Sequence, residues 1–97
     1  MNNEKYLPLG TVVSLKGGKK RVMIDGFCII DSEEPNKVFD YCGVLFPEGI
    51  LKSEQNFMFN HDEIEKVYFL GLVDEEQKDF NNRLINVTTK YYNDENK

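Results

Sequence analysis

The sequence predicts a small α+β protein, in which about five strands form a strongly bent antiparallel β-sheet or SH3-like barrel and a C-terminal α-helix follows. Short β-branched or aromatic runs alternate with turns that contain glycine or proline, which is typical of antiparallel strands. One glycine lies inside a long apolar run and favours the bend that a small barrel needs. A last segment has the 3.6-residue period of an amphipathic helix. A flatter α+β sandwich is the alternative.

The first hairpin is expected near the N-terminus. Thr11–Lys16 is β-branched and roughly alternating, and Arg21–Asp25 is the strand that returns beside it. Gly17 and Gly18 lie between them, and two glycines accept a positive φ at both central positions of a tight type I′ turn. We therefore expect these two strands to be antiparallel neighbours.

The second and third strands come from two longer apolar runs. Gly26 predicts a bend, after which the strand continues through Phe27–Ile30. Asp31–Lys37 is polar and is expected to be a loop. Val38–Phe46 is apolar on both faces, so this strand is either central in the sheet or bends at Gly43.

The remaining elements are shorter until the final helix. Phe57–Phe59 is a short strand, Asn60–Glu63 has the pattern of a capping box, and Val67–Leu70 is the last strand. Asp74 opens the helix, whose acidic first turn complements the helix dipole. Its apolar stripe is expected to lie on the sheet and consists of Phe80, Leu84, Val87 and Tyr91.

Length and charge exclude several classes of protein. With 97 residues and 11.3 kDa, residues 1–97 are one domain, with a core at 7–91 and a polar, frayed tail at 92–97. The net charge of −5 opposes binding to nucleic acid or to anionic membranes. There is no apolar stretch for a membrane span and no signal-peptide pattern at the start, so we expect a cytoplasmic protein.

The residues that most often carry chemistry are few. Cys28 and Cys42 are expected to be buried thiols in a reducing compartment, and whether they lie close enough for a disulfide is left open. With His61 they provide too few ligands at motif spacing for a metal site, and no cofactor motif is found. His61 lies beside Asp62 and Glu63, but no nucleophile accompanies it, so we assign it a structural role and no catalytic residue is predicted.

The candidate binding residues are apolar side chains near a turn. Ile50 and Leu51 follow the Pro47–Gly49 turn, where they either anchor the loop on the core or form an exposed binding patch with Phe46. Together with the C-terminal helix, these three residues are the predicted protein-binding site.

Several motifs along the chain together resemble a known family. They are Leu7–Gly18, Val22–Ile24, Phe39–Tyr41, Pro47–Gly49, Phe59–Ile64, Val67–Gly71 and Asp74–Glu76. In this order they resemble the DUF4176 family of small cytosolic proteins from Gram-positive bacteria, over about residues 7 to 84. Members of the family tend to be encoded beside type VII secretion components and LXG-type toxins.

The resemblance implies a non-enzymatic adaptor that binds another protein. The first hypothesis is a cytosolic targeting chaperone for an LXG-type toxin exported by type VII secretion. The second is an immunity protein that neutralises the same toxin, and the third is a nucleic-acid-binding small barrel, which the acidic charge opposes. The expected partner is therefore a secreted toxin, with no nucleic acid, membrane or cofactor.

Overall fold

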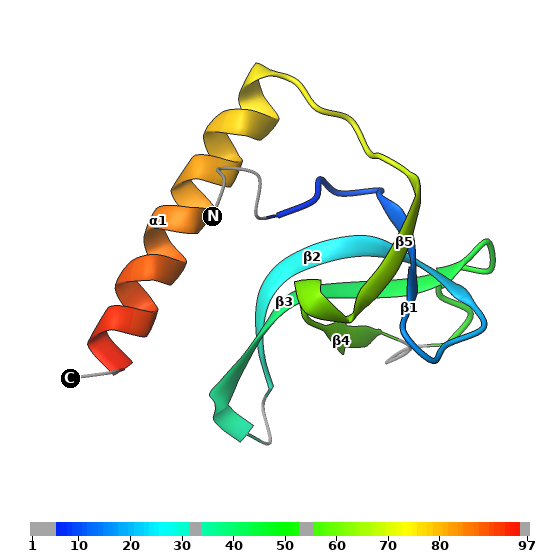
Figure 1. Cartoon of the computed structure of the whole chain (residues 1–97), viewed down its shortest axis with the longest axis horizontal. Helices are drawn as coiled ribbons and strands as arrows, with labels where there is room; N and C mark the ends of the chain where they lie inside the picture. Colours follow the sequence, from blue (N-terminus) through cyan, green and yellow to red (C-terminus); the bar gives the residue numbers. More distant parts are fainter. Residues whose placement is uncertain (1–5, 32–33, 53–55, 96–97) are drawn as a thin grey trace.

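The computed structural model describes the backbone of residues 6–31, 34–52 and 56–95, and the side chains of residues 6–27, 38–52 and 56–89. Within these residues, five antiparallel strands form one sheet in the order β4-β3-β2-β1-β5, and one long helix follows (Figure 1). The predicted α+β class is confirmed. The sheet is curled, but it does not close into a barrel, because β4 and β5 remain its two edges.

The elements follow the predicted order along the chain. Their bounds are β1 Val12–Leu15, β2 Arg21–Asp31, β3 Glu34–Phe46, β4 Phe57–Phe59, the 3-10 turn η1 His61–Glu63, β5 Ile64–Phe69 and α1 Glu75–Glu95. The capping box predicted at η1 is present.

The turn between β1 and β2 differs from the predicted two-residue hairpin. Only Gly17 of the two glycines has a positive φ, of 80°, and the Gly18 N–H donates to the Leu15 carbonyl over 2.9 Å. A positive φ at the third residue of a turn is the pattern of type II, which needs a single glycine. The connection then continues to Arg21, where β2 begins.

The hairpin of β2 and β3 is longer than predicted. The register between them shifts between Ile24 and Gly26, which confirms a bend there. However, β3 begins at Glu34, so much of the expected loop at Asp31–Lys37 is strand. Pro35 is tolerated because β4 pairs β3 only at Tyr41–Gly43, so that within the described residues the outer edge near Pro35 needs no donor.

The hydrophobic core lies inside the curl of the sheet. Its buried members are Tyr6, Val13, Val22, Ile24, Tyr41 and Phe59. The Tyr41 ring is fully buried, with its centroid 6.1 Å from those of Tyr6 and Phe27 and 5.5 Å from that of Phe59. One aromatic side chain on β3 therefore holds together the N-terminal segment, β2 and β4.

The linker after β5 crosses closely over the segment before β1. The Gly71 N–H donates to Thr11 Oγ1 over 3.0 Å, and Thr11 Oγ1 donates to the Pro8 carbonyl over 2.7 Å. A Cβ at position 71 would lie 2.0 Å from the Leu9 carbonyl oxygen, so only glycine fits here. This crossing fixes where α1 begins.

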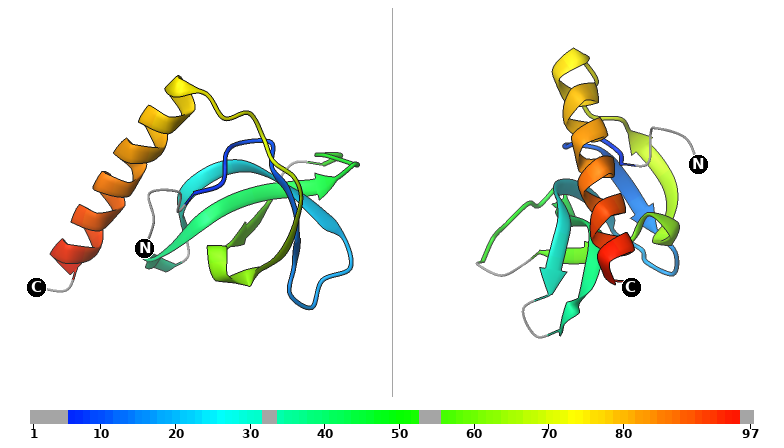
Figure 2. Two further views of the ribbon diagram at one scale, coloured as in Figure 1. Left: turned by 45° about the horizontal axis from the view of Figure 1, so that its top comes forward. Right: turned by 90° about the vertical axis from the view of Figure 1, so that its left-hand side faces the viewer.

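Helix α1 stands beside the sheet instead of lying flat on it (Figures 1 and 2). Leu84 packs against the core as predicted, but Phe80 is 50% exposed and Val87 is 65% exposed. The buried positions near Leu84 include Asn81 and Thr88, because the helix packs on the N-terminal segment, where the Tyr6 hydroxyl donates to Thr88 Oγ1 over 3.3 Å. The predicted apolar stripe is therefore partly wrong; the Tyr91 side chain lies outside the described residues.

Candidate functional site

The single histidine meets a hydroxyl of the core. Nδ1 of His61 lies 2.6 Å from the Tyr41 hydroxyl, which also accepts the Leu7 N–H over 3.0 Å. The Leu7 N–H, the Tyr41 hydroxyl and the His61 imidazole therefore form one chain of hydrogen bonds. The arrangement ties η1 and the N-terminal segment to β3.

The carboxylates around His61 are occupied by backbone groups. The His61 N–H donates to Asp40 Oδ2 and the Asn60 N–H donates to Glu63 Oε1, each over 2.9 Å. Both contacts satisfy N–H groups at the start of η1, which otherwise have no partner in the turn. Across the described residues, no group of three or more His, Cys, Asp or Glu side chains is placed to hold a metal ion.

Cys42 is half-buried and carries a free thiol. The thiol donates to Asp25 Oδ1 over 3.1 Å. Burial, followed by the hydrogen bond and the charge of Asp25, raises the pKa of Cys42 to about 12. Since the thiolate is the nucleophilic form, these surroundings disfavour reaction of Cys42. The Cys28 side chain lies outside the described residues, so the question of a disulfide stays open.

The three candidate residues near the Pro47–Gly49 turn are placed differently from one another. We call them the loop patch, defined as Phe46, Ile50 and Leu51. Ile50 is 56% and Leu51 is 74% exposed, so they do not anchor the loop on the core. Phe46 is half-buried, with the Arg21 guanidinium 5.1 Å from its ring centroid. The exposed alternative fits Ile50 and Leu51, and their binding role stays a prediction.

The cations of the β1–β2 turn contact neighbouring elements. Lys20 forms an ion pair with Glu48 beside the loop patch, and this contact lowers the pKa of the Glu48 carboxyl. Arg21 lies over the rings of both Phe46 and Tyr68, the second at 5.7 Å. Aromatic faces attract such cations, so these contacts hold the turn against β3 and β5.

A second apolar surface lies between α1, the N-terminal segment and the linker. Its cavity has a volume of about 430 Å³, and we call it the helix cleft. The apolar walls include Leu9, Phe27, Leu72, Phe80 and Leu84, and Asp74 and Glu76 also line it. The rings of Phe27 and Phe80 are 5.8 Å apart, which places the helix close to β2 here.

Another cavity lies on the opposite flank of α1. It has a volume of about 480 Å³ and is lined by Leu7, Pro8, Leu70, Val73 and residues of the first turns of α1. Its charged lining residue is Lys78, whereas the helix cleft has two carboxylates. Tyr6 lines both cavities, so the two flanks of α1 are separated by the ring that seats the helix.

Comparison with known protein families gave one match, which covers most of the chain. The model of a family described as a domain of unknown function, DUF4176, matches residues 6–80. The chain belongs to the DUF4176 family. The match covers the sheet, the linker and the first turns of α1, and so includes most of the helix cleft. No curated protein and no solved structure gave a match.

The DUF4176 match ends at residue 80, so most of α1 lies outside the matched region. No helical segment among the described residues has an apolar run sufficient for crossing a bilayer.

The predictions from sequence identified the loop patch and the helix, but they missed Leu9 and Leu72 of the helix cleft. The available signal for Leu72 is the apolar run that continues past Gly71, beyond the end of β5.

Proposed function

We propose that this DUF4176 protein is a non-enzymatic, cytoplasmic adaptor that binds another polypeptide, as a targeting chaperone for an LXG-type toxin exported by the type VII secretion system. The observation that carries the proposal is the amount of exposed apolar surface. Thirteen large apolar or aromatic side chains among the described residues are exposed, in a chain of 97 residues. Where such side chains form a contiguous patch, they mark a protein interaction site.

Five of these side chains lie in two regions that a partner can cover. Ile50 and Leu51 belong to the loop patch, and Leu9, Leu72 and Phe80 to the helix cleft. Interfaces draw most of their affinity from a few apolar or aromatic anchors that become buried, while charges steer the encounter. A chaperone uses such a surface to cover apolar residues of a client before export. The toxin assignment itself rests on the family resemblance.

The test is co-expression with an LXG-type toxin of the same organism, followed by gel filtration. A chaperone elutes together with the toxin as one complex, and elution as two separate species contradicts the proposal. The toxin is then divided into its export domain and its toxic C-terminal domain. Binding to the export domain supports the chaperone function. Binding to the toxic domain together with protection of cells identifies an immunity protein instead.

A further inference from the structure

We propose that the helix cleft binds a basic, amphipathic segment of the partner, whose apolar side chains enter the cleft while its lysine or arginine side chains meet Asp74 and Glu76. The inference rests on the proposed adaptor function and deepens it by naming the chemistry of the segment that is bound.

The first argument is the shape and lining of the cleft. Its volume of about 430 Å³ lies within the range of sites that enclose a ligand group. The walls come from four separate parts of the fold: Leu9 before β1, Phe27 on β2, Leu72 on the linker, and Phe80 and Leu84 on α1. An apolar side chain inserted here contacts all of them at once and removes them from water.

The second argument is that part of the lining is left exposed to solvent. Leu72 is 76% exposed and Phe80 is 50% exposed. Val87 lies two turns beyond Phe80 on the same flank of α1 and is also exposed. Because a helix buries its apolar stripe where it can, this uncovered flank predicts a second chain packed alongside α1.

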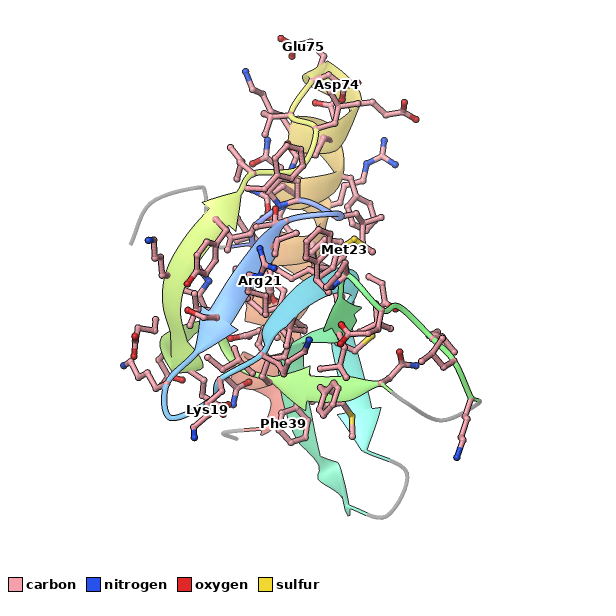
Figure 3. All side chains as sticks on the ribbon, turned by 90° about the vertical axis from the view of Figure 1, so that its right-hand side faces the viewer. Lys19, Arg21, Met23, Phe39, Asp74 and Glu75 are labelled. Atoms are coloured by element: carbon pink, nitrogen blue, oxygen red, sulfur yellow. The ribbon has the colours of Figure 1, made fainter. Side chains whose placement is uncertain are left out.

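The third argument is charge, which decides what kind of segment fits. Both charged side chains that line the cleft are acidic, and Glu75 and Asp79 extend the acidic surface around the same end of α1. Figure 3 shows Asp74 and Glu75 together at this end, well apart from Lys19 on the β1–β2 turn. Carboxylates at the rim favour a basic partner and repel an acidic one.

The same charges argue against other occupants. A second copy of this chain carries the same net charge of −5, so two copies repel each other overall. Nucleic acid is opposed in the same way, because its phosphates would face Asp74 and Glu76. The cavity on the opposite flank has Lys78 instead, so the preference for a basic segment is specific to the helix cleft.

The experiment uses two synthetic helical peptides, each about 18 residues long, with the same leucine face. One carries lysine and the other glutamate on its polar face. Binding to the full chain is measured by fluorescence anisotropy at low and at physiological salt. We expect the lysine peptide to bind and to lose affinity as salt rises, and the glutamate peptide to bind at least about tenfold more weakly.

Variants then locate the binding site. Phe80→Ser or Leu72→Ser weakens the lysine peptide about tenfold or more, because an apolar wall of the cleft is lost. Leu72 is 76% exposed and lies outside the buried cluster, so Leu72→Ser keeps the test valid if Phe80→Ser does not fold. The matched control is Phe57→Ser on β4, where a phenylalanine 43% exposed lies outside both the cleft and the loop patch, and it leaves the affinity unchanged.

The role of charge has its own matched pair. Glu76→Gln lowers the affinity about two- to fivefold and reduces its dependence on salt. Glu65→Gln, on β5, changes the net charge equally but lies outside the cleft and leaves binding unchanged. Asp74 is left intact because its Oδ1 caps α1 by accepting the Gln77 N–H over 2.8 Å.

Some outcomes overturn the inference and leave the adaptor function intact. Equal binding of the two peptides, or loss of binding in Phe57→Ser but not in Leu72→Ser, rules out the helix cleft as a site for basic segments. Co-elution with the toxin in that case still supports the adaptor. Conversely, the lysine peptide can bind selectively while the toxin does not co-elute. That result supports the helix cleft as a site for basic segments and excludes the toxin as the protein that supplies the segment.

Discussion

Two aromatic side chains in this small fold have opposite surroundings. Tyr41 on β3 is fully buried, contacts the rings of Tyr6, Phe27, Phe59 and His61, and shares its hydroxyl with Leu7 and His61. Phe80 on α1 contacts the Phe27 ring, but half of its surface remains in water. Tyr41 therefore stabilises the fold, whereas the exposed part of the Phe80 ring is available to contact another molecule.

The difference arises from how the two regions are covered. Tyr41 lies inside the curl of the sheet, where strands from both sides of β3 bring side chains to it. Helix α1 is held at its first turns by the linker and at Thr88 by Tyr6, which leaves one flank open. Stability and binding are therefore expected to separate when residues of the two regions are changed.

The largest loss of stability is expected for Tyr41→Ala. Removing a buried aromatic side chain costs about 3–5 kcal/mol, and here the Leu7 N–H also loses its acceptor. Phe80→Ala is the matched change in the open region and costs about 1–2 kcal/mol, because the ring is half exposed. Urea unfolding followed by circular dichroism measures both. Equal losses of stability would contradict the difference in burial between the two rings.

The next largest loss is expected for Gly71→Ala. The new Cβ would lie 2.0 Å from the Leu9 carbonyl oxygen, so the linker must move away from the segment before β1. We expect a loss of about 3 kcal/mol, at the upper end for overpacking, because the obstacle is backbone. The control is Gly18→Ala, whose Cβ meets only Leu15 atoms at 3.4 Å or more. A Gly71→Ala protein as stable as the Gly18→Ala protein contradicts the close crossing.

A smaller loss is expected for Thr11→Val, which keeps the side-chain shape but removes the hydroxyl. Thr11 Oγ1 accepts the Gly71 N–H and donates to the Pro8 carbonyl in a fully buried position. The substitution leaves the Gly71 N–H without its acceptor, whereas the Pro8 carbonyl still accepts the Thr11 N–H over 3.2 Å, so we expect a loss of about 1–2 kcal/mol. Hydrogen exchange is expected to accelerate at the Gly71 amide. Ser14→Val in the adjoining strand β1 is the control, because Ser14 is only half-buried.

The sheet could be predicted from sequence because its signals are local. Alternation, turn glycines and the capping box at Asn60–Glu63 predicted the order of the strands, and the glycine in the long run predicted the bend. The type of the first turn and the start of β3 were wrong, since both depend on how the strands pair. Pro35 is typical of a loop, but β3 can contain it because β4 pairs with β3 only at Tyr41–Gly43.

The placement of α1 could not be predicted in the same way. The 3.6-residue period identified the stripe that includes Phe80 and Val87, but not the surface that covers it. That surface is the N-terminal segment, and its contact through Tyr6 and Thr88 joins residues 82 positions apart. Because polar positions of α1 face Tyr6, the apolar stripe is displaced toward solvent. The helix cleft follows from this long-range contact, which has no local signature.

The smallest effect on stability is expected for Val87→Ser, which continues the open flank of α1. Val87 is 65% exposed, so the free energy of unfolding changes by about 0.5 kcal/mol or less. If a second chain packs along this flank, the same substitution weakens binding of the toxin while the melting temperature stays constant. Thermal unfolding and gel filtration of the co-expressed pair measure the two quantities. A large loss of stability would mean that the Val87 side chain packs within the fold. In that case Val87 would not be available to a second chain along this flank of α1.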